Sequence, residues 1–312
     1  MLQHVHNASV FQTGTRRLKI GWDGAHWIVD VEGCEDLFAG LKRILRGWNI
    51  AEQPVTGMAE PAMVFRKSGD TYDWILPASG MTAKNLFGKP ESIASAVSDF
   101  HYLFNGWFTD RFREYFTLHC AAVRLGDGVV LFPGGHRVGK SLLTVALAAH
   151  GHMVFADDVV AIEPAGGNAM ALGMLPRIRL PLPPQAIGVQ LRDFLDRHAI
   201  LDDVEQQYLD LSEDRMAEVG RTSPITAIVQ LKRSNKTGPA SMDEQTNGAA
   251  MRALIAQNYS TAMPASSVFD HLSEIVSGAS CHCMTYHKVE DAVSVLEAAF
   301  ARRSDRQTGV GQ

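Results

Sequence analysis

The sequence has few cysteines and no long apolar run. Four cysteines among 312 residues are too few for the disulfide frameworks on which small secreted proteins depend. Residues 1–17 contain no apolar stretch of signal-peptide length, and no run approaches the roughly 20 apolar residues that span a bilayer. We therefore expect a cytoplasmic protein without a membrane partner.

An excess of positive charge is also lacking. The chain carries 29 basic and 34 acidic side chains, which gives a formal net charge of −5. A protein that binds nucleic acid irrespective of sequence needs a basic surface to displace counterions, so we expect no nucleic-acid partner. Hydrophobic residues make up 46% of the chain, enough for a substantial core, and the length suits one large domain or two ordinary ones.

The first part of the chain, residues 1–107, is predicted to form a small accessory domain of α+β type. Asp23-Gly24 and Ser68-Gly69-Asp70 each separate two strand-like segments, and such residues favour hairpin turns. Two further segments carry apolar side chains at helical spacing: Leu37, Leu41, Ile44, Leu45 and Trp48, then Ile93, Val97, Phe100, Phe104 and Trp107. Core packing explains these side chains, and we find no catalytic constellation among them.

The second part, residues 108–303, alternates strand-like and helix-like segments, which predicts an α/β domain. The expected strands are TLHCAAVRL, VVLFPG, HMVFADDVVAI, PITAIVQLKR and SCHCMTYH. The expected helices are SLLTVALAAHG and residues 243–257, 265–277 and 289–301. Residues 304–312 are expected to form a disordered tail.

A glycine-rich loop carries the strongest chemical signal. Gly134, four further residues and then Gly139-Lys140-Ser141 fit the phosphate-binding pattern G-x-x-x-x-G-K-[ST], between a strand-like segment and a helix-like one. Backbone N–H groups of such a loop form an anion-binding nest, while the lysine reaches the β- and γ-phosphates and the serine hydroxyl reaches Mg²⁺. The alternative is a glycine-rich turn with an exposed lysine. We predict that ATP or GTP, with Mg²⁺, binds to Gly134, Gly135, His136, Arg137, Val138, Gly139, Lys140, Ser141 and Leu142.

Two adjacent carboxylates and one histidine are the other candidate site residues. Asp157 and Asp158 follow Lys140 by 17 and 18 residues, an interval of one helix, a turn and a strand, so the chain returns beside the loop. One carboxylate there can hold Mg²⁺ and the other can accept a proton from a hydroxyl, although an Asp-Asp turn in solvent is the simpler alternative. His119 is expected on the strand that pairs with VVLF. A lone histidine on a strand is more often a core or edge residue.

LHCAAV, the glycine-rich loop and ADDVV together resemble the catalytic domain of the HPr kinase/phosphorylase family. In style they are similar to the related kinases encoded beside ribosomal peptide gene clusters, including lasso-peptide clusters. The resemblance covers residues 117–164 and continues more weakly through LPRIRLPLP to the last helix. It implies an α/β fold with a P-loop nucleotide-binding domain of the HPr kinase and phosphoenolpyruvate carboxykinase type, preceded by a smaller α+β domain.

The resemblance also implies roles for individual residues. His119 would lie near the transferred phosphate and the two aspartates. Asp158 is favoured as the catalytic proton acceptor and Asp157 as the metal ligand, together with Ser141. Lys140 would contact the phosphates.

The chain departs from the family pattern at two places. His136 and Arg137 replace the Ser-Gly of the family loop, so Arg137 must follow another path, bear backbone strain or offer a second cation to the phosphates. The family's downstream glutamate has no match, and LPRIRL supplies Arg177 and Arg179 in its place. In an extended chain these two arginines point the same way, so they are candidates for binding an anion. The anion could be the acceptor's carboxylate, the nucleotide phosphate or a surface acid of the protein, although a solvated basic loop would also explain the pair.

Together these features predict an enzyme, a nucleotide-dependent kinase of HPr-kinase type. It would transfer the γ-phosphoryl group to a hydroxyl, preferably a serine of a peptide or small protein. The alternatives are a small-molecule kinase or carboxykinase-like enzyme on the same fold, and a non-catalytic nucleotide-binding module. We do not expect zinc at Cys281-His282-Cys283, because neighbouring strand residues face opposite sides. Formation of a homo-oligomer is left open.

Overall fold

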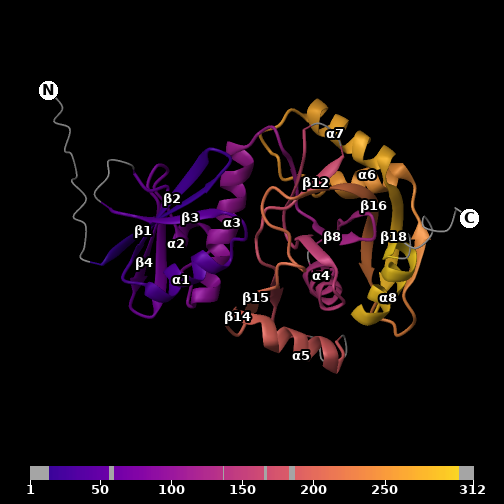
Figure 1. Ribbon diagram of the computed structural model, residues 1–312, viewed down its shortest axis with the longest axis horizontal. Coiled ribbons are helices and arrows are strands. Elements are labelled where there is room, and N and C mark those ends of the chain that lie inside the picture. The colour runs from indigo at the N-terminus through magenta and orange to yellow at the C-terminus, as the bar shows by residue number, and fades with distance from the viewer. Residues whose placement is uncertain (1–13, 56–59, 136, 165–166, 183–186, 302–312) are drawn as a thin grey trace, which may run out of the picture. The chain divides into compact units, whose positions relative to one another are not determined.

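The computed structural model describes residues 14–55, 60–135, 137–164, 167–182 and 187–301 (Figure 1). Its contacts divide the chain into two compact units. The first comprises the chain up to Lys42 together with Asn49–Asp99, and the second comprises Arg43–Trp48 together with the chain from Phe100 onward. The predicted domain limits, 1–107 and 108–303, stay a prediction, and the predicted tail, 304–312, lies outside the described residues.

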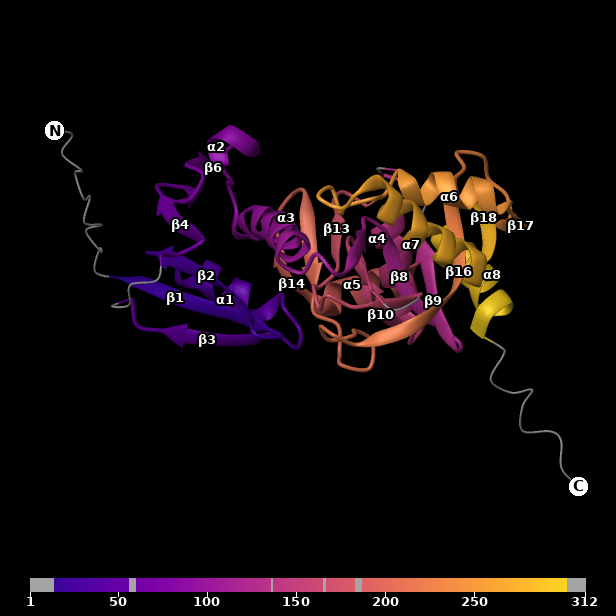
Figure 2. The ribbon, with the colours of Figure 1, turned by 90° about the horizontal axis from the view of Figure 1, so that it is seen from above.

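The first unit is built on one six-stranded sheet. The strand order is β3-β1-β2-β4-β5-β6, and Figure 2 shows it from β3 to the short strand β6 beside α2. The strands are β1 (Thr15–Trp22), β2 (Ala25–Glu32), β3 (Asn49–Gln53), β4 (Met63–Ser68), β5 (Thr71–Leu76) and β6 (Met81–Thr82). The helices are α1 (Glu35–Arg43), α2 (Ala83–Leu86) and the beginning of α3 (Ile93–Arg111).

Both predicted hairpins of this unit are confirmed. β1 and β2 are antiparallel and meet at Asp23 and Gly24, whose φ angles of 45° and 74° are both positive, as a type I′ turn requires. β4 and β5 are antiparallel, and Gly69 in their turn has φ 63°. Turn chemistry thus sets the register of both strand pairs.

The first predicted helix ends earlier than its apolar spacing suggests. α1 stops at Arg43, so Ile44, Leu45 and Trp48 follow the helix instead of lying on its face. The cause is pairing with a distant segment: the backbone N–H of Leu175 donates to the carbonyl of Ile44, and Leu45 forms a β-bridge with Met174. Tertiary backbone hydrogen bonds here prevail over local helical periodicity.

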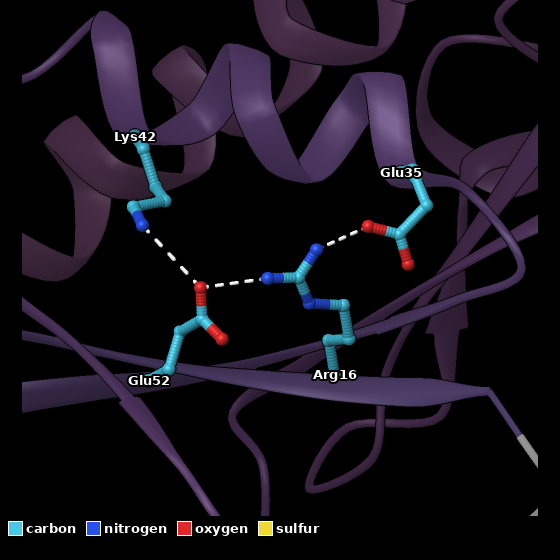
Figure 3. Close-up of polar contacts among 4 residues, drawn as sticks. All are labelled: Arg16, Glu35, Lys42 and Glu52. Atoms are coloured by element: carbon cyan, nitrogen blue, oxygen red, sulfur yellow. Dashed lines mark hydrogen bonds and ion pairs between the residues drawn. The ribbon is translucent and has the colours of Figure 1, made fainter.

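A polar cluster fastens α1 to the sheet of the first unit (Figure 3). Arg16 on β1 donates hydrogen bonds to Glu35 at the start of α1 and to Glu52 on β3, the latter at 2.7 Å. The ammonium group of Lys42 reaches the same Glu52 oxygen at 3.3 Å. Below this exposed cluster, the Arg17 guanidinium forms a buried ion pair with Asp30 at 2.6 and 2.8 Å.

The second unit is built on a nine-stranded mixed sheet. Its order is β10-β8-β9-β16-β12-β11-β7, with β18 paired to β16 and β17 paired to β18. The long strand β16 is parallel to β9 and β18, and the other pairs are antiparallel. The strands are β7 (Phe116–Leu118), β8 (Ala121–Leu125), β9 (Gly128–Phe132), β10 (Met153–Ala156), β11 (Val160–Ile162), β12 (Asn168–Met170), β16 (Thr222–Arg233), β17 (Ser241–Glu244) and β18 (Ser280–Tyr286).

Helices cover both faces of this sheet. α4 (Lys140–Ala149) and α8 (Val289–Phe300) pack on one face, while α6 (Asn247–Ile255) and α7 (Ala265–Gly278) pack on the other (Figure 1). The strands β9, β10 and β11 are accordingly apolar, and all five residues of β9 are buried. The prediction of a helix over 243–257 was wrong at its start, because Asp243 and Glu244 pair with β18 as part of β17.

A small sheet, β13-β15-β14, extends the second unit. Its strands are β13 (Arg177–Arg179), β14 (Ala199–Asp202) and β15 (Gln206–Leu209), and α5 (Val189–His198) precedes β14. The segment with four prolines is thus non-helical as predicted where it is described, and residues 183–186 lie outside the described part. No helix among the described residues is both long and apolar enough to cross a membrane.

Candidate active site

Two strand junctions bring the histidine and the carboxylates together. The segment TLHCAAVRL was predicted as one strand, but it forms two, β7 and β8, which are separated by His119 and Cys120. Likewise Asp157 and Asp158 separate β10 from β11. β8 pairs with β10 and β7 pairs with β11, so the two junctions lie opposite each other. His119 therefore does not lie on the strand that pairs with VVLF, because the chain leaves one strand pair there and joins another.

The glycine loop, residues 133–139, runs from the end of β9 to the start of α4. Gly139 caps the helix with φ 98°, a conformation that glycine adopts without strain. The Lys140 ammonium group donates to the carbonyl of Gly134 at 2.7 Å, and the Tyr286 hydroxyl donates to the carbonyl of Val138 at 2.8 Å. Two contacts thus fix the loop from within the domain. His136 was predicted to bind the nucleotide and lies outside the described residues.

The loop and the junctions open into one cavity of about 450 Å³. The predicted site residues in its wall are His119, Gly135, Arg137, Val138, Gly139, Lys140, Ser141, Leu142, Asp157, Asp158, Arg177 and Arg179. Gly134 is buried behind the loop, where its carbonyl holds Lys140. The fold therefore brings residues as far apart in sequence as His119 and Arg179, 60 positions, to the wall of one cavity.

Asp157 is buried and incompletely hydrogen-bonded. Its side chain accepts a hydrogen bond from the backbone N–H of Arg177 at 3.0 Å, while its other oxygen, Oδ1, has no hydrogen-bond partner among the described residues. Burial raises the pKa of Asp157 to about 6, although the Arg177 N–H and the nearby Ser141 hydroxyl oppose the rise. A buried carboxylate with an open oxygen is suited to receiving a proton or a cation.

The pKa of Asp158 shifts in the opposite direction to that of Asp157. Burial would raise its pKa, but a hydrogen bond from His119 and the electrostatic influence of the nearby His101, His119 and Arg177 hold the pKa well below its usual range. The His119 Nε2 atom lies 2.9 Å from Asp158 Oδ1, and both side chains remain partly exposed to the cavity. Asp158 is therefore ionised at neutral pH, and an imidazole is positioned to share an incoming proton with it.

Cationic side chains outnumber carboxylates around the cavity. Five cations line it, Arg137, Lys140, Arg177, Arg179 and Arg233, against Asp157 and Asp158, which leaves an excess of three positive charges. Burial lowers the pKa of Lys140, although Cys120 and the two aspartates oppose this. Burial and then the neighbouring Arg177 and Arg137 lower the pKa of Arg179. Crowded like charges of this kind favour the binding of a polyanion.

Three residues of the site were not predicted from the sequence. His101 on α3 lines the cavity, and burial lowers its pKa to about 4. Its neighbours Phe100 and Phe104 made that helix look like simple core. Arg233 and Tyr286 pair in register at the carboxyl ends of the parallel strands β16 and β18. Ligands bind at such ends in α/β sheets, and this rule could have identified both residues.

The second unit holds no preformed metal cage in its described part. Nowhere in the described residues are three or more histidine, cysteine, aspartate and glutamate side chains arranged to hold a metal ion. Cys281 is buried, whereas Cys283 is partly exposed. A metal at the cavity would therefore need ligands from a bound molecule in addition to the protein.

Comparisons with known proteins give distant structural likenesses and no sequence match. No family model matches the sequence, and no curated protein sequence matches it. Among solved structures, the chain is similar to the Hpr(Ser) kinase/phosphatase from Coxiella burnetii, with 14% sequence identity and a TM-score of 0.28. The match covers 58% of this chain and 91% of that chain. The similarity is partial.

Proposed function

We propose that this protein is a nucleotide-dependent kinase that transfers the γ-phosphoryl group of ATP or GTP to the hydroxyl of a serine in a peptide or small protein. One observation carries the proposal: the glycine loop at the start of α4 opens into the same cavity as the His119–Asp158 pair. A candidate phosphate-binding loop and a candidate proton acceptor thus line the same cavity. Phosphoryl transfer needs these two functions and charge neutralisation.

The residues present fit a bound Mg²⁺. Asp157 Oδ1 is buried without a hydrogen-bond partner among the described residues, and Ser141 lies beside that carboxylate. A divalent cation would supply a positive counter-charge to the buried carboxylate, and Mg²⁺ prefers oxygen ligands. Asp157 and Ser141 would hold the ion, and the nucleotide phosphates and water would complete its ligands. When bound, Mg²⁺ neutralises charge on the phosphates.

The remaining steps follow from the chain's own groups. The N–H groups of the glycine loop and the Lys140 ammonium bind the phosphates. The serine hydroxyl attacks the γ-phosphorus, a new P–O bond forms, the bond to the β-phosphate oxygen breaks, and the nucleoside diphosphate leaves. The hydroxyl proton passes to the His119–Asp158 pair, which lies at 2.9 Å spacing in the cavity wall.

Arg177 is the acceptor-binding candidate that the structure supports best. Its guanidinium donates to the Gln206 side chain at 2.9 Å, and its backbone N–H donates to Asp157. The residue is therefore fixed beside the reactive carboxylates. Its guanidinium could bind the carboxylate of a peptide that ends in serine. Arg177→Ala should weaken use of such a peptide while sparing nucleotide binding, and the corresponding peptide amide should be the poorer substrate of the wild type.

Incubation of the purified protein with labelled nucleotide, Mg²⁺ and a library of serine-containing peptides tests the proposal. We expect label to enter a subset of peptides, and we expect nucleotide with Mg²⁺ to raise the thermal midpoint of the wild type but not of Lys140→Ala. Nucleotide binding without any transfer would favour the non-catalytic module. Lys140→Ala protein that binds nucleotide as well as the wild type would refute the phosphate-binding role of the loop.

A further inference from the structure

Arg137 is held in a conformation that its side chain disfavours. Its φ angle is 63°, and among the described residues Asp23, at a hairpin turn, is the one other non-glycine residue with positive φ. Aspartate tolerates that region because its short side chain can hydrogen-bond locally, whereas arginine gains no such compensation. Strained backbone of this kind persists where the surroundings over-determine it, and it is enriched at functional sites.

The surroundings of Arg137 are fixed on both sides. On the amino-terminal side, Lys140 holds the Gly134 carbonyl, and on the carboxy-terminal side, Tyr286 holds the Val138 carbonyl at 2.8 Å. A Cβ atom at Gly139 would clash with the same Tyr286 hydroxyl. The hydrogen bond from Tyr286 therefore restrains the loop on the carboxy-terminal side of the turn at Arg137.

The strained turn places a cation among other cations. Arg137 lines the cavity together with Arg177 and Arg179 of β13, and Arg137 is one of the charges that lower the pKa of Arg179. Asp157 and Asp158 act on Arg179 in the opposite direction, so the guanidinium groups lie at the carboxylate end of the cavity. That end is where the phosphate transferred to an acceptor must be. A bound anion would relieve the like-charge repulsion there, and its binding would offset the cost of the backbone strain.

We propose that Arg137 and Arg179 clamp the terminal phosphate of a bound nucleoside triphosphate from two sides, with Arg137 placed there by the turn that Lys140 and Tyr286 fix. The inference rests on the proposed nucleotide site and extends it to specificity. The glycine loop contacts phosphates that a diphosphate also has, and Lys140 reaches the β-phosphate as well as the γ-phosphate, whereas the clamp contacts only the phosphate that is unique to the triphosphate. The clamp therefore makes the site select triphosphate over diphosphate.

Three substitutions at Arg137 separate charge from strain. Arg137→Gly removes both, Arg137→Asn removes the charge in a residue that tolerates positive φ, and Arg137→Lys keeps the charge. The measurements are calorimetric dissociation constants, with Mg²⁺, for a non-hydrolysable triphosphate analogue and for the matching diphosphate, and the thermal midpoint of the ligand-free protein. Arg113→Ala, an exposed arginine outside the cavity wall, is the control for a simple loss of charge.

We expect Arg137→Gly and Arg137→Asn to weaken triphosphate binding about 10- to 100-fold, the range for a lost charge-assisted hydrogen bond, and diphosphate binding by less than about threefold. Arg137→Gly should also raise the thermal midpoint of the ligand-free protein. Arg137→Lys should keep most of the selectivity, and Arg113→Ala should change neither constant. Arg179→Ala should repeat the selective loss and be non-additive with Arg137→Gly, because both would act on one phosphate.

An equal loss of triphosphate and diphosphate affinity, or no loss of either, would overturn the clamp. Because these constants need no acceptor, that result is distinct from failure of the kinase. A wild type that prefers triphosphate through Arg137 but phosphorylates no acceptor would support the clamp and contradict the proposed transfer. A wild type that binds neither nucleotide would refute both.

Discussion

The two units of this protein use charged side chains in opposite ways. In the first unit several cations have acidic partners: Arg16 with Glu35 and Glu52, Arg17 with Asp30, Arg66 with Glu32, and Lys89 with Asp73. In the second unit, five cations and two carboxylates line one cavity. Paired charges stabilise a structure or fix its register, whereas an imbalance of charge around a cavity requires a ligand. The difference in charge balance is consistent with ligand binding at the cavity of the second unit, independently of any motif.

Perturbed pKa values follow the same division. In the first unit, Arg16 and Glu52 shift in the directions that keep both charged, since each gains a partner of opposite sign. In the second unit, Asp157 shifts towards its neutral form while Asp158 next to it shifts towards its charged form. Neighbouring carboxylates with opposed shifts are a hallmark of sites that divide proton and cation chemistry between two groups.

The largest expected effect tests the proton acceptor of the second unit. Asp158→Asn preserves shape but removes the charge paired with His119, so the turnover rate should fall by roughly 10²–10⁴-fold, as for loss of a general base. Nucleotide affinity should change much less, because Asp158 does not hold the phosphates in the proposed site. Radiometric turnover and calorimetric binding on the same preparation check this. A near-normal turnover rate in Asp158→Asn would show that the carboxylate of Asp158 has no catalytic role and that the two aspartates only form a turn.

A comparable change in the first unit should affect stability and leave chemistry intact. Arg17→Ala leaves the buried Asp30 carboxylate unpaired, which should lower the free energy of unfolding by about 3–5 kcal/mol. Urea unfolding measures the loss, and nucleotide binding by the remaining folded protein should be unchanged. The matched control is Arg17→Met with Asp30→Leu, which should recover most of the stability. A selective loss of nucleotide affinity in Arg17→Ala would contradict the conclusion that charged pairs of the first unit serve stability alone.

Asp157 should couple stability to pH. Its folded pKa of about 6 exceeds the unfolded value of roughly 3.9, so the unfolded chain loses this proton first as the pH rises. The free energy of unfolding therefore falls between about pH 4 and pH 6 and stays lower above that range. Asp157→Asn should stabilise the metal-free protein by up to about 3 kcal/mol at pH 7.5 and give no such gain near pH 4.

Urea unfolding of wild type and Asp157→Asn in the presence of a chelator, at both pH values, provides the measurement. Adding Mg²⁺ with nucleotide should reverse the ranking at pH 7.5, because the cation needs the carboxylate. An equal gain at both pH values would show that the substitution improves packing instead of removing a buried charge.

The smallest effect is expected in the exposed cluster of the first unit. Glu52→Gln removes the charge that Arg16 and Lys42 share, and all three side chains are well exposed. Such surface pairs contribute about 0–1 kcal/mol, so the unfolding midpoint should move little and less still in high salt. A larger loss would show that this cluster anchors α1 and would weaken the contrast between the units.

Much of the local structure could be predicted, because it depends on residues close in sequence. Asp23, Gly24 and Gly69 adopt positive φ, and residues that tolerate such angles favour hairpin turns when they separate two strand-like segments. The glycine loop between β9 and α4 and the interruption at Asp157 and Asp158 were likewise visible in the sequence. The length of α1 was not, since Ile44 and Leu45 pair with a segment about 130 residues away, from Met174 to Leu175.

The sequence by itself determined which groups were available for chemistry, while the tertiary structure decided which of them meet. Spacing and residue type sufficed to select Lys140, Asp157 and Asp158, because motif and turn chemistry are local. Only strand pairing could split the chain at His119 and set it 2.9 Å from Asp158. Only packing could bury His101 in the cavity wall and bring Tyr286 to the Val138 carbonyl. Charge balance and pKa depend on every neighbour in space, and those neighbours come from strands and helices that are remote in sequence.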